Sequence, residues 1–129
     1  MKLFSPEKAN ALIPILEPLI EQLWTRRRDL AIRLLGSDLA TRSGGRHGSQ
    51  TSAARRHDAR RSAEMKAEIM AIINRIEAHG CIVKDVDLGL LDFPALRDGR
   101  PVFLCWKLGE PQIAYWHRAD ESYADRKEL

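Results

Sequence analysis

The sequence predicts an α+β fold: a long antiparallel helical hairpin packed on a small antiparallel meander of three to four strands. Two observations lead to this fold. Apolar residues recur at helical spacing over two stretches in the first 80 residues. The last 50 residues instead hold short apolar runs separated by Asp98-Gly99 and by Leu108-Gly109-Glu110-Pro111, which are typical turn sequences. With 129 residues, the chain is expected to form a single domain, 1–129.

The first helix is expected over residues 5–35. Ser5 is a favourable N-cap, and Pro6 suits the first helical position. Pro14 and Pro18 lie inside the apolar pattern, and each removes a backbone donor, so we expect a helix kinked by its prolines. Gly36 is a natural residue to follow the end of a helix.

Residues 36–50 are rich in Gly, Ser, Thr and Arg and are expected to form a flexible loop. A second helix is expected over 51–79, followed by Gly80. Its second half alone carries large apolar side chains at helical spacing: Met65, Ile69, Ile72 and Ile76. We therefore expect only the half of the hairpin near Pro18 and Ile76 to be well packed, and the distal half to fray more easily.

Residues 81–117 are expected to form the meander, and 118–129 a tail. A two-residue turn at Asp98-Gly99 predicts that Phe93 lies opposite Leu104 and Asp92 opposite Cys105. A four-residue turn at 108–111 predicts that Leu104 lies opposite Tyr115 and Phe103 opposite Trp116.

Alternation of side chains then divides the meander into two faces. One face, which includes Trp106, Tyr115 and His117, is expected to cover the helices. The other face holds the candidate ligand or interface residues: Asp92, Leu96, Phe103, Cys105, Lys107 and Trp116. This second face is too apolar for a plain solvent face, and such patches usually contact a partner or a ligand. We therefore expect a homodimer formed through it, which makes the protein an interaction or scaffolding module.

The motifs KDVDLGLLDFPALRDGRPVFLCWKLGEPQIAYWH and FSPEKANALIPILEPLI resemble an uncharacterised bacterial protein family, domain of unknown function 2203. The resemblance covers both ends of the chain, whereas the middle, 37–50, is richer in Gly and Ser than the family's pattern. It implies this helix-and-meander architecture and a bacterial, intracellular setting. It implies no activity, so no residue inherits a role from it.

Cys105 is predicted to be a packed, inert thiol and not a nucleophile. Asp92 across the strands would raise the thiol pKa, and His117 is expected on the opposite face. A metal site built from His117, Asp120 and Glu110, with Asp92, is the alternative considered. Its spacing matches no standard ligand pattern, so no metal and no cofactor are predicted.

Two further alternatives stay open. The first is that the protein binds a small molecule or a metal at the face that holds Asp92, Cys105 and Trp116, with an enzymatic reaction there as one option. The second is weak nucleic-acid binding through a basic helix that contains Arg55, Arg56, Arg60 and Arg61. That helix has no interleaved aromatic residues, which favours a solvated face. No apolar run is long enough to span a bilayer, and the two cysteines are too few for a disulfide scaffold, so a cytoplasmic protein is expected.

Overall fold

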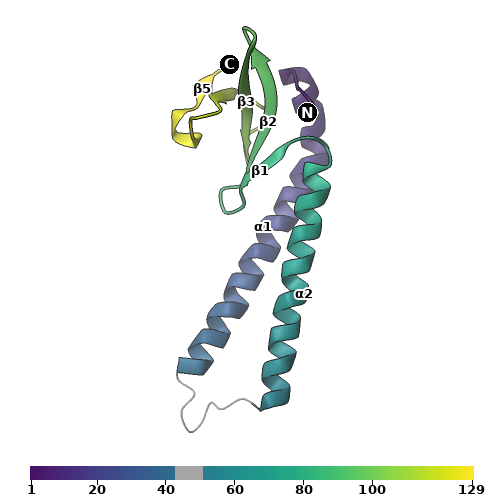
Figure 1. Ribbon diagram of the computed structural model, residues 1–129, viewed down its shortest axis with the longest axis vertical. Helices are drawn as coiled ribbons and strands as arrows, with labels where there is room; N and C mark the ends of the chain where they lie inside the picture. Colours follow the sequence, from purple (N-terminus) through teal and green to yellow (C-terminus); the bar gives the residue numbers. More distant parts are fainter. Residues whose placement is uncertain (43–50) are drawn as a thin grey trace.

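The computed structural model describes residues 1–42 and 51–129 and shows two long helices followed by a five-stranded antiparallel sheet (Figure 1). The predicted α+β fold is confirmed, with more strands than expected. The elements are α1 (Pro6–Arg42), α2 (Ser52–Glu77), β1 (Ile82–Asp85), β2 (Leu90–Arg97), β3 (Arg100–Lys107), β4 (Tyr115–Arg118), the 3-10 helix η1 (Tyr123–Asp125) and β5 (Lys127–Glu128). The strands lie side by side in chain order.

Helix α1 begins as its sequence predicts, because the Ser5 hydroxyl accepts a hydrogen bond from the Lys8 amide at 3.2 Å. Pro14 and Pro18 both lie inside the continuous helix. Its first, purple turns in Figure 1 run in a different direction from the rest. The expected end at residue 35 is wrong: α1 continues through Gly36 to Arg42. Gly36 ends a helix only when it adopts a left-handed conformation, and it does not do so here.

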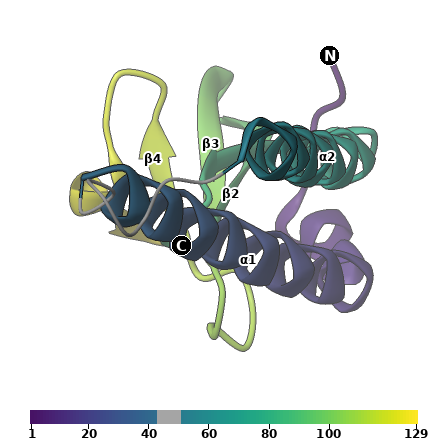
Figure 2. The ribbon, with the colours of Figure 1, turned by 90° about the horizontal axis from the view of Figure 1, so that it is seen from below.

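The two helices pack antiparallel and lie side by side when seen from below (Figure 2). Leucines at helical spacing on α1 pack against the apolar face of α2. Thr51 is the N-cap of α2. The buried residues of this seam are Leu16, Leu19, Leu23, Leu30, Met65, Ile69, Ile72 and Ile76. The same apolar core continues into the sheet through Phe93, Leu104 and Trp106.

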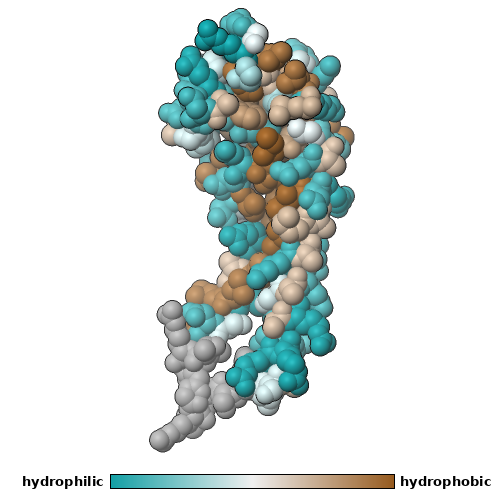
Figure 3. All heavy atoms as spheres, viewed as in Figure 1, coloured by the Kyte–Doolittle hydropathy of each residue, from teal (hydrophilic) through white to brown (hydrophobic). Residues whose placement is uncertain are grey.

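Only half of the hairpin belongs to this core. Leu30 and Met65 are the outermost buried apolar residues of the described parts of α1 and α2. Brown, apolar side chains gather where the hairpin meets the sheet in Figure 3, whereas teal, hydrophilic ones dominate the lower end of α2. The predicted difference in packing between the two halves is confirmed. The expected loop falls partly on residues 43–50, which lie outside the described residues.

The first strand turn follows the prediction. Asp98 and Gly99 have φ values of 53° and 76°, as a two-residue type I′ turn requires. Arg97 therefore lies opposite Arg100, Phe93 opposite Leu104 and Asp92 opposite Cys105.

The second predicted turn is wrong by one residue. Cys105 lies opposite Tyr115, Leu104 opposite Trp116 and Phe103 opposite His117. The segment 108–114 leaves the sheet because the Ile113 amide donates to Asn10 Oδ1 of α1 at 2.7 Å, and the Ile113 side chain is buried in the core. A shift of one residue exchanges the two faces of a strand. Trp116 consequently shares the face of Leu104, and His117 shares the face of Cys105.

Residues 118–129 are folded and complete the sheet. Trp116 of β4 pairs with Lys127 of β5. The Leu129 amide donates to the Ala114 carbonyl at 2.9 Å. Between β4 and β5, η1 is held by Ser122 and Asp125, whose side chain accepts from the Ser122 amide at 3.0 Å. This segment, 119–126, lies beside the sheet and places the Arg126 guanidinium next to the Cys105 sulfur.

Candidate functional site

Asp92, Cys105 and His117 come from three neighbouring strands and meet on one face of the sheet. Asp92 and Cys105 are direct partners on β2 and β3. His117 lies opposite Phe103, which is two residues from Cys105, so the side chains of β4 and β3 point to the same side here. All three residues are buried, with exposed fractions of 2%, 1% and 2%. One ligand atom from each lies within 4.8 Å of the other two.

The hydrogen bonds of His117 define its tautomer. Its Nδ1 lies 2.8 Å from the Arg118 carbonyl oxygen. A carbonyl only accepts, so Nδ1 carries a hydrogen and donates it. Its Nε2 lies 3.0 Å from both Asp92 oxygens. In a neutral imidazole this nitrogen would direct a lone pair at a carboxylate, which is repulsive. Either a hydrogen shared between these two groups or a metal ion is therefore needed between them.

The Cys105 thiol is protonated in this environment. Burial and the neighbouring Asp92 charge raise its pKa to about 12, and Arg126 offsets part of that increase. A catalytic cysteine needs a base that accepts its proton. His117 has no free nitrogen for that task, since one binds the Arg118 carbonyl and the other faces Asp92. The geometry does not support a cysteine nucleophile, which agrees with the inert thiol expected from the sequence.

Arg126 closes the cluster from the C-terminal segment. Its Nη1 lies 3.9 Å from the Cys105 sulfur and 3.0 Å from Glu110 Oε1. Its guanidinium lies 4.2 Å from the centroid of the Tyr115 ring and 4.3 Å from that of Tyr123. A charge held by both an ion pair and two rings is well fixed. Arg126 is therefore a positioned donor next to the thiol sulfur.

The residues predicted from the sequence are only partly brought together. Asp92, Phe103 and Cys105 share one face, and the Phe103 ring lies 5.6 Å from the His117 ring. Trp116 is on the other face, against the core. Leu96 remains 55% exposed, and Lys107 is half-buried. The expected open apolar patch is therefore absent from the described part of the sheet, because its centre is polar and buried.

His117 is the functional candidate that sequence reasoning placed wrongly. A four-residue turn after Lys107 predicts that its side chain lies on the helix-facing side, whereas the observed register places it on the opposite face. The Ile113–Asn10 hydrogen bond that changes this register joins residues 103 apart in the sequence. The other two residues considered as ligands do not join the cluster as ligands: Glu110 pairs with Arg126 beside it, and Asp120 lines a separate pocket.

The basic residues of α2 do not form one uniform charged face. Arg61 donates to Glu64 and Glu68 at 3.3 and 3.4 Å, which offsets its charge. Arg55, Arg56 and Arg60 are exposed. Nucleic-acid binding through this helix stays a prediction.

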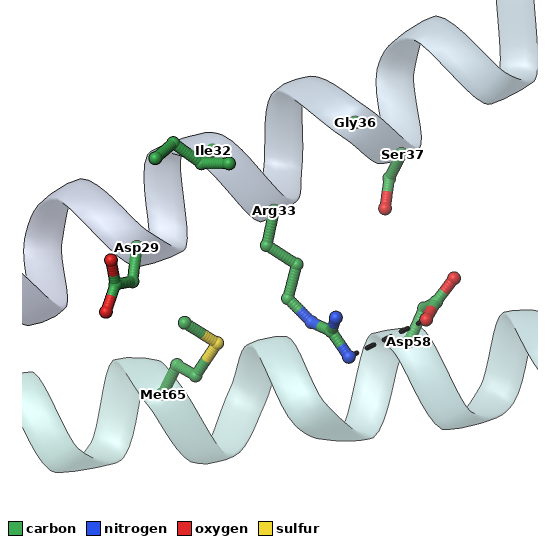
Figure 4. Close-up of a pocket in the computed structure, with 7 residues that line it drawn as sticks. All are labelled: Asp29, Ile32, Arg33, Gly36, Ser37, Asp58 and Met65. Atoms are coloured by element: carbon green, nitrogen blue, oxygen red, sulfur yellow. Dashed lines mark ion pairs between the residues drawn. The ribbon is translucent and has the colours of Figure 1, made fainter.

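A hollow of about 520 Å³ lies between α1 and α2 where the apolar seam ends (Figure 4). Arg33 extends from α1 toward Asp58 of α2, and their charged atoms are 3.7 Å apart. The Arg33 Nε is buried without a hydrogen-bond partner in the described structure. Met65 closes one side of the hollow. The pocket marks the point where the two helices separate.

Across residues 1–42 and 51–129, neither helix is long and apolar enough to cross a membrane. Comparison with family models matches residues 2–129 to an uncharacterised conserved protein family, domain of unknown function 2203. Comparisons with curated proteins and with solved structures gave no match. The chain therefore belongs to this family, as the sequence motifs indicated.

Proposed function

Because the family assigns no activity, we propose from the site itself that the protein binds one transition-metal ion of the zinc class through Asp92, Cys105 and His117. The observation that carries this proposal is the orientation of His117. Its Nδ1–H donates to a backbone carbonyl while Nε2 faces the Asp92 carboxylate. Metal-binding histidines commonly donate their second ring N–H to a carbonyl or carboxylate in this way.

The ligand types and spacing support this proposal. Thiolate, imidazole and carboxylate are all common zinc ligands. Zinc at about 2.1 Å from a nitrogen and an oxygen in tetrahedral geometry separates these two atoms by roughly 3.4 Å. The corresponding His117 and Asp92 atoms are 3.0 Å apart, so a small adjustment would admit the ion. Both Asp92 oxygens face the histidine, so a bidentate carboxylate can supply a fourth donor atom.

Charge balance supports it as well. A divalent ion neutralises one thiolate and one carboxylate, and His117 then remains neutral. A buried site is far less costly when its charges sum to zero. The metal also stabilises the thiolate directly, which overcomes the raised pKa of Cys105. Arg126 beside the sulfur is paired with Glu110 and so adds no net charge.

We propose a structural role for the ion. The three ligand residues are almost completely buried, whereas a catalytic zinc needs a position open to substrate. The ion would join β2, β3 and β4 at the middle of the sheet. We also propose a bacterial, cytoplasmic setting. The bacterial origin is what the family resemblance implies, and the free thiols of Cys81 and Cys105 support a reducing compartment such as the cytoplasm.

Metal titration of the chelator-treated protein tests the proposal. We expect calorimetry to show one Zn²⁺ per chain, with the dissociation constant raised more than about 100-fold in Cys105→Ser or His117→Gln. Cys81→Ser is the matched control, since Cys81 is also buried but its sulfur donates to the Ile76 carbonyl. This control should bind as the wild type does.

A second readout separates ligand loss from misfolding. Cobalt(II) in place of zinc should give a thiolate-to-metal absorption band in the wild type and in Cys81→Ser, and no such band in Cys105→Ser. Circular dichroism of each variant establishes that it is folded. Wild-type protein that binds no ion, or binding that is unchanged in folded Cys105→Ser, would exclude the proposal.

As a second proposal, we retain the homodimer expected from the sequence and move its contact to the hairpin. Ile32, Leu35 and Leu39 are 61%, 59% and 54% exposed on α1 and follow a three-four spacing. This is the spacing of apolar residues that pack between helices, and a second copy would present the same row.

A further inference from the structure

A second cavity lies at the end of the sheet, separate from the Asp92–Cys105–His117 cluster. It has a volume of about 650 Å³, within the range of small-molecule pockets. Its lining residues come from the adjoining ends of β2 and β3 and the turn between them, from β4 and from the residues after β4. They include Arg97, Arg100, Trp116 and Arg118.

The strand register brings the three arginines to the same face. Arg97 is directly opposite Arg100. Arg118 is opposite Val102, which is two residues from Arg100 and therefore on the same side of β3. Like charges placed directly opposite each other on neighbouring strands destabilise a sheet. An anion bound between them would relieve that repulsion.

The three guanidinium groups are available for a ligand. Within the described residues, no carboxylate forms an ion pair with Arg97, Arg100 or Arg118. Asp98 and Asp120 also line the cavity. They reduce its formal charge to +1, so the ligand has to reach the guanidinium groups on the side away from these carboxylates.

Trp116 lines the same cavity and lies on the same face as the arginines. The ring itself is held by Arg97 at 4.5 Å and by Lys127 at 5.0 Å from its centroid. An arginine that already stacks on an aromatic ring is preorganised for binding an anion.

We propose that this cavity binds a small organic phosphate. Arginine forks pair with phosphate oxygens in two parallel hydrogen bonds, and three forks on one face match a group with several oxygens. The cavity has room for an organic part beside the phosphate. This proposal is independent of the metal site, because none of the residues lining the cavity is a proposed metal ligand.

The test uses the full chain and three probes: inorganic phosphate, adenosine monophosphate and citrate. Binding is followed by isothermal titration and by the fluorescence of Trp116, with Trp116→Phe to identify its signal. We expect adenosine monophosphate to bind more tightly than inorganic phosphate, and citrate to bind more weakly than either.

Arg100→Gln and Arg118→Gln should each weaken adenosine monophosphate binding by about tenfold or more, since each removes a charge-assisted hydrogen bond. Arg75→Gln, an exposed arginine on α2 outside the basic cluster, should leave the affinity unchanged. Thermal unfolding identifies any variant that is misfolded, and the test rests on two separate arginine variants. No binding of any probe to the wild type, tighter binding of citrate than of the phosphates, or equal weakening in Arg75→Gln would overturn the proposal.

Discussion

His117 has two ring nitrogens with different neighbours, and this asymmetry decides what the buried cluster can do. The Arg118 carbonyl fixes the proton on Nδ1, so Nε2 is left to interact with Asp92. Because both ring nitrogens already have partners, His117 has no nitrogen left to accept the proton of Cys105. Elementary hydrogen-bond chemistry therefore favours metal binding over nucleophilic catalysis at this site.

Cys81 provides a prediction at the residue scale that does not depend on a metal. Burial raises its pKa from 9.0 to about 11, with a smaller increase from the Glu77 charge and a partial decrease from a backbone hydrogen bond. A thiol whose pKa is higher in the folded state favours folding fully below its unfolded value and loses that contribution as the pH rises through the folded value. The free energy of unfolding should therefore fall between about pH 9 and pH 11.

Urea denaturation over this pH range measures the effect. Cys81→Ala lacks the thiol, so its stability should fall less over the same interval than that of the wild type. Identical pH profiles for the two proteins would show that Cys81 does not titrate in this way.

At the scale of elements, the sequence predicted the tight hairpin between β2 and β3 and therefore the contact between Asp92 and Cys105. A two-residue Asp-Gly turn permits a single register. It did not predict the register of β4, because that strand follows a segment held by a side chain of α1. Local turn rules contain no information about a contact of that kind. The tail was also missed, since η1 and β5 depend on pairing with β4.

A substitution at Arg126 tests whether the C-terminal segment shields the Asp92–Cys105–His117 cluster from solvent. Its ion pair with Glu110 is 3.0 Å long, and the two side chains are 12% and 20% exposed. Arg126→Ala leaves a largely buried carboxylate unpaired, so we expect unfolding free energy to fall by about 2 kcal/mol. Arg56→Ala, an exposed change on α2, should alter it by less than about 0.5 kcal/mol.

The reactivity of Cys105 gives a second measure of the same cover. A small thiol reagent should modify Cys105 in Arg126→Ala faster than in the wild type, when Cys81 is replaced in both proteins. Equal modification rates together with equal stabilities would contradict this role of Arg126.

Alanine substitutions at two glycines are expected to change the free energy of unfolding in opposite directions, one through helix propensity and the other through backbone strain. Gly36 lies in regular helix, and a Cβ there would meet nothing within 4 Å. Gly36→Ala should therefore raise the free energy of unfolding by up to about 1 kcal/mol. Gly89 has φ +65°, and a Cβ there would lie 2.7 Å from Leu108 Cβ.

Gly89→Ala should consequently lower the free energy of unfolding by at least about 1 kcal/mol. Chemical denaturation of both variants beside the wild type gives the comparison. A destabilising Gly36→Ala would show that α1 does not continue past residue 36 in solution.

At the scale of the whole molecule, the protein consists of a well-packed half and an extended hairpin end. The sheet and the adjoining halves of α1 and α2 share one core, which ends at Leu30 and Met65. The exposed row of Ile32, Leu35 and Leu39 lies beyond it on α1. The apolar spacing of the sequence predicted the packed half. It could not distinguish the core leucines of α1 from the exposed ones, because the same spacing continues along α1 beyond the point where the apolar face of α2 ends.

Self-association is the prediction that belongs to this scale. Light scattering over a range of concentrations should show a dimer for the wild type. Ile32→Glu with Leu35→Glu should shift the population to monomer, while Leu96→Glu, on the sheet face, should not. A wild type that is monomeric at every concentration would exclude the dimer, and dissociation by Leu96→Glu would return the contact to the sheet.

The central claim is that a metal ion sits among Asp92, Cys105 and His117. A crystal structure of the zinc-loaded protein with anomalous scattering measured at the zinc absorption edge tests it most directly. We predict one strong peak at about 2.0–2.3 Å from His117 Nε2, Cys105 Sγ and an Asp92 oxygen. No peak within that cluster, or zinc bound only at an exposed residue such as His57, would contradict the account.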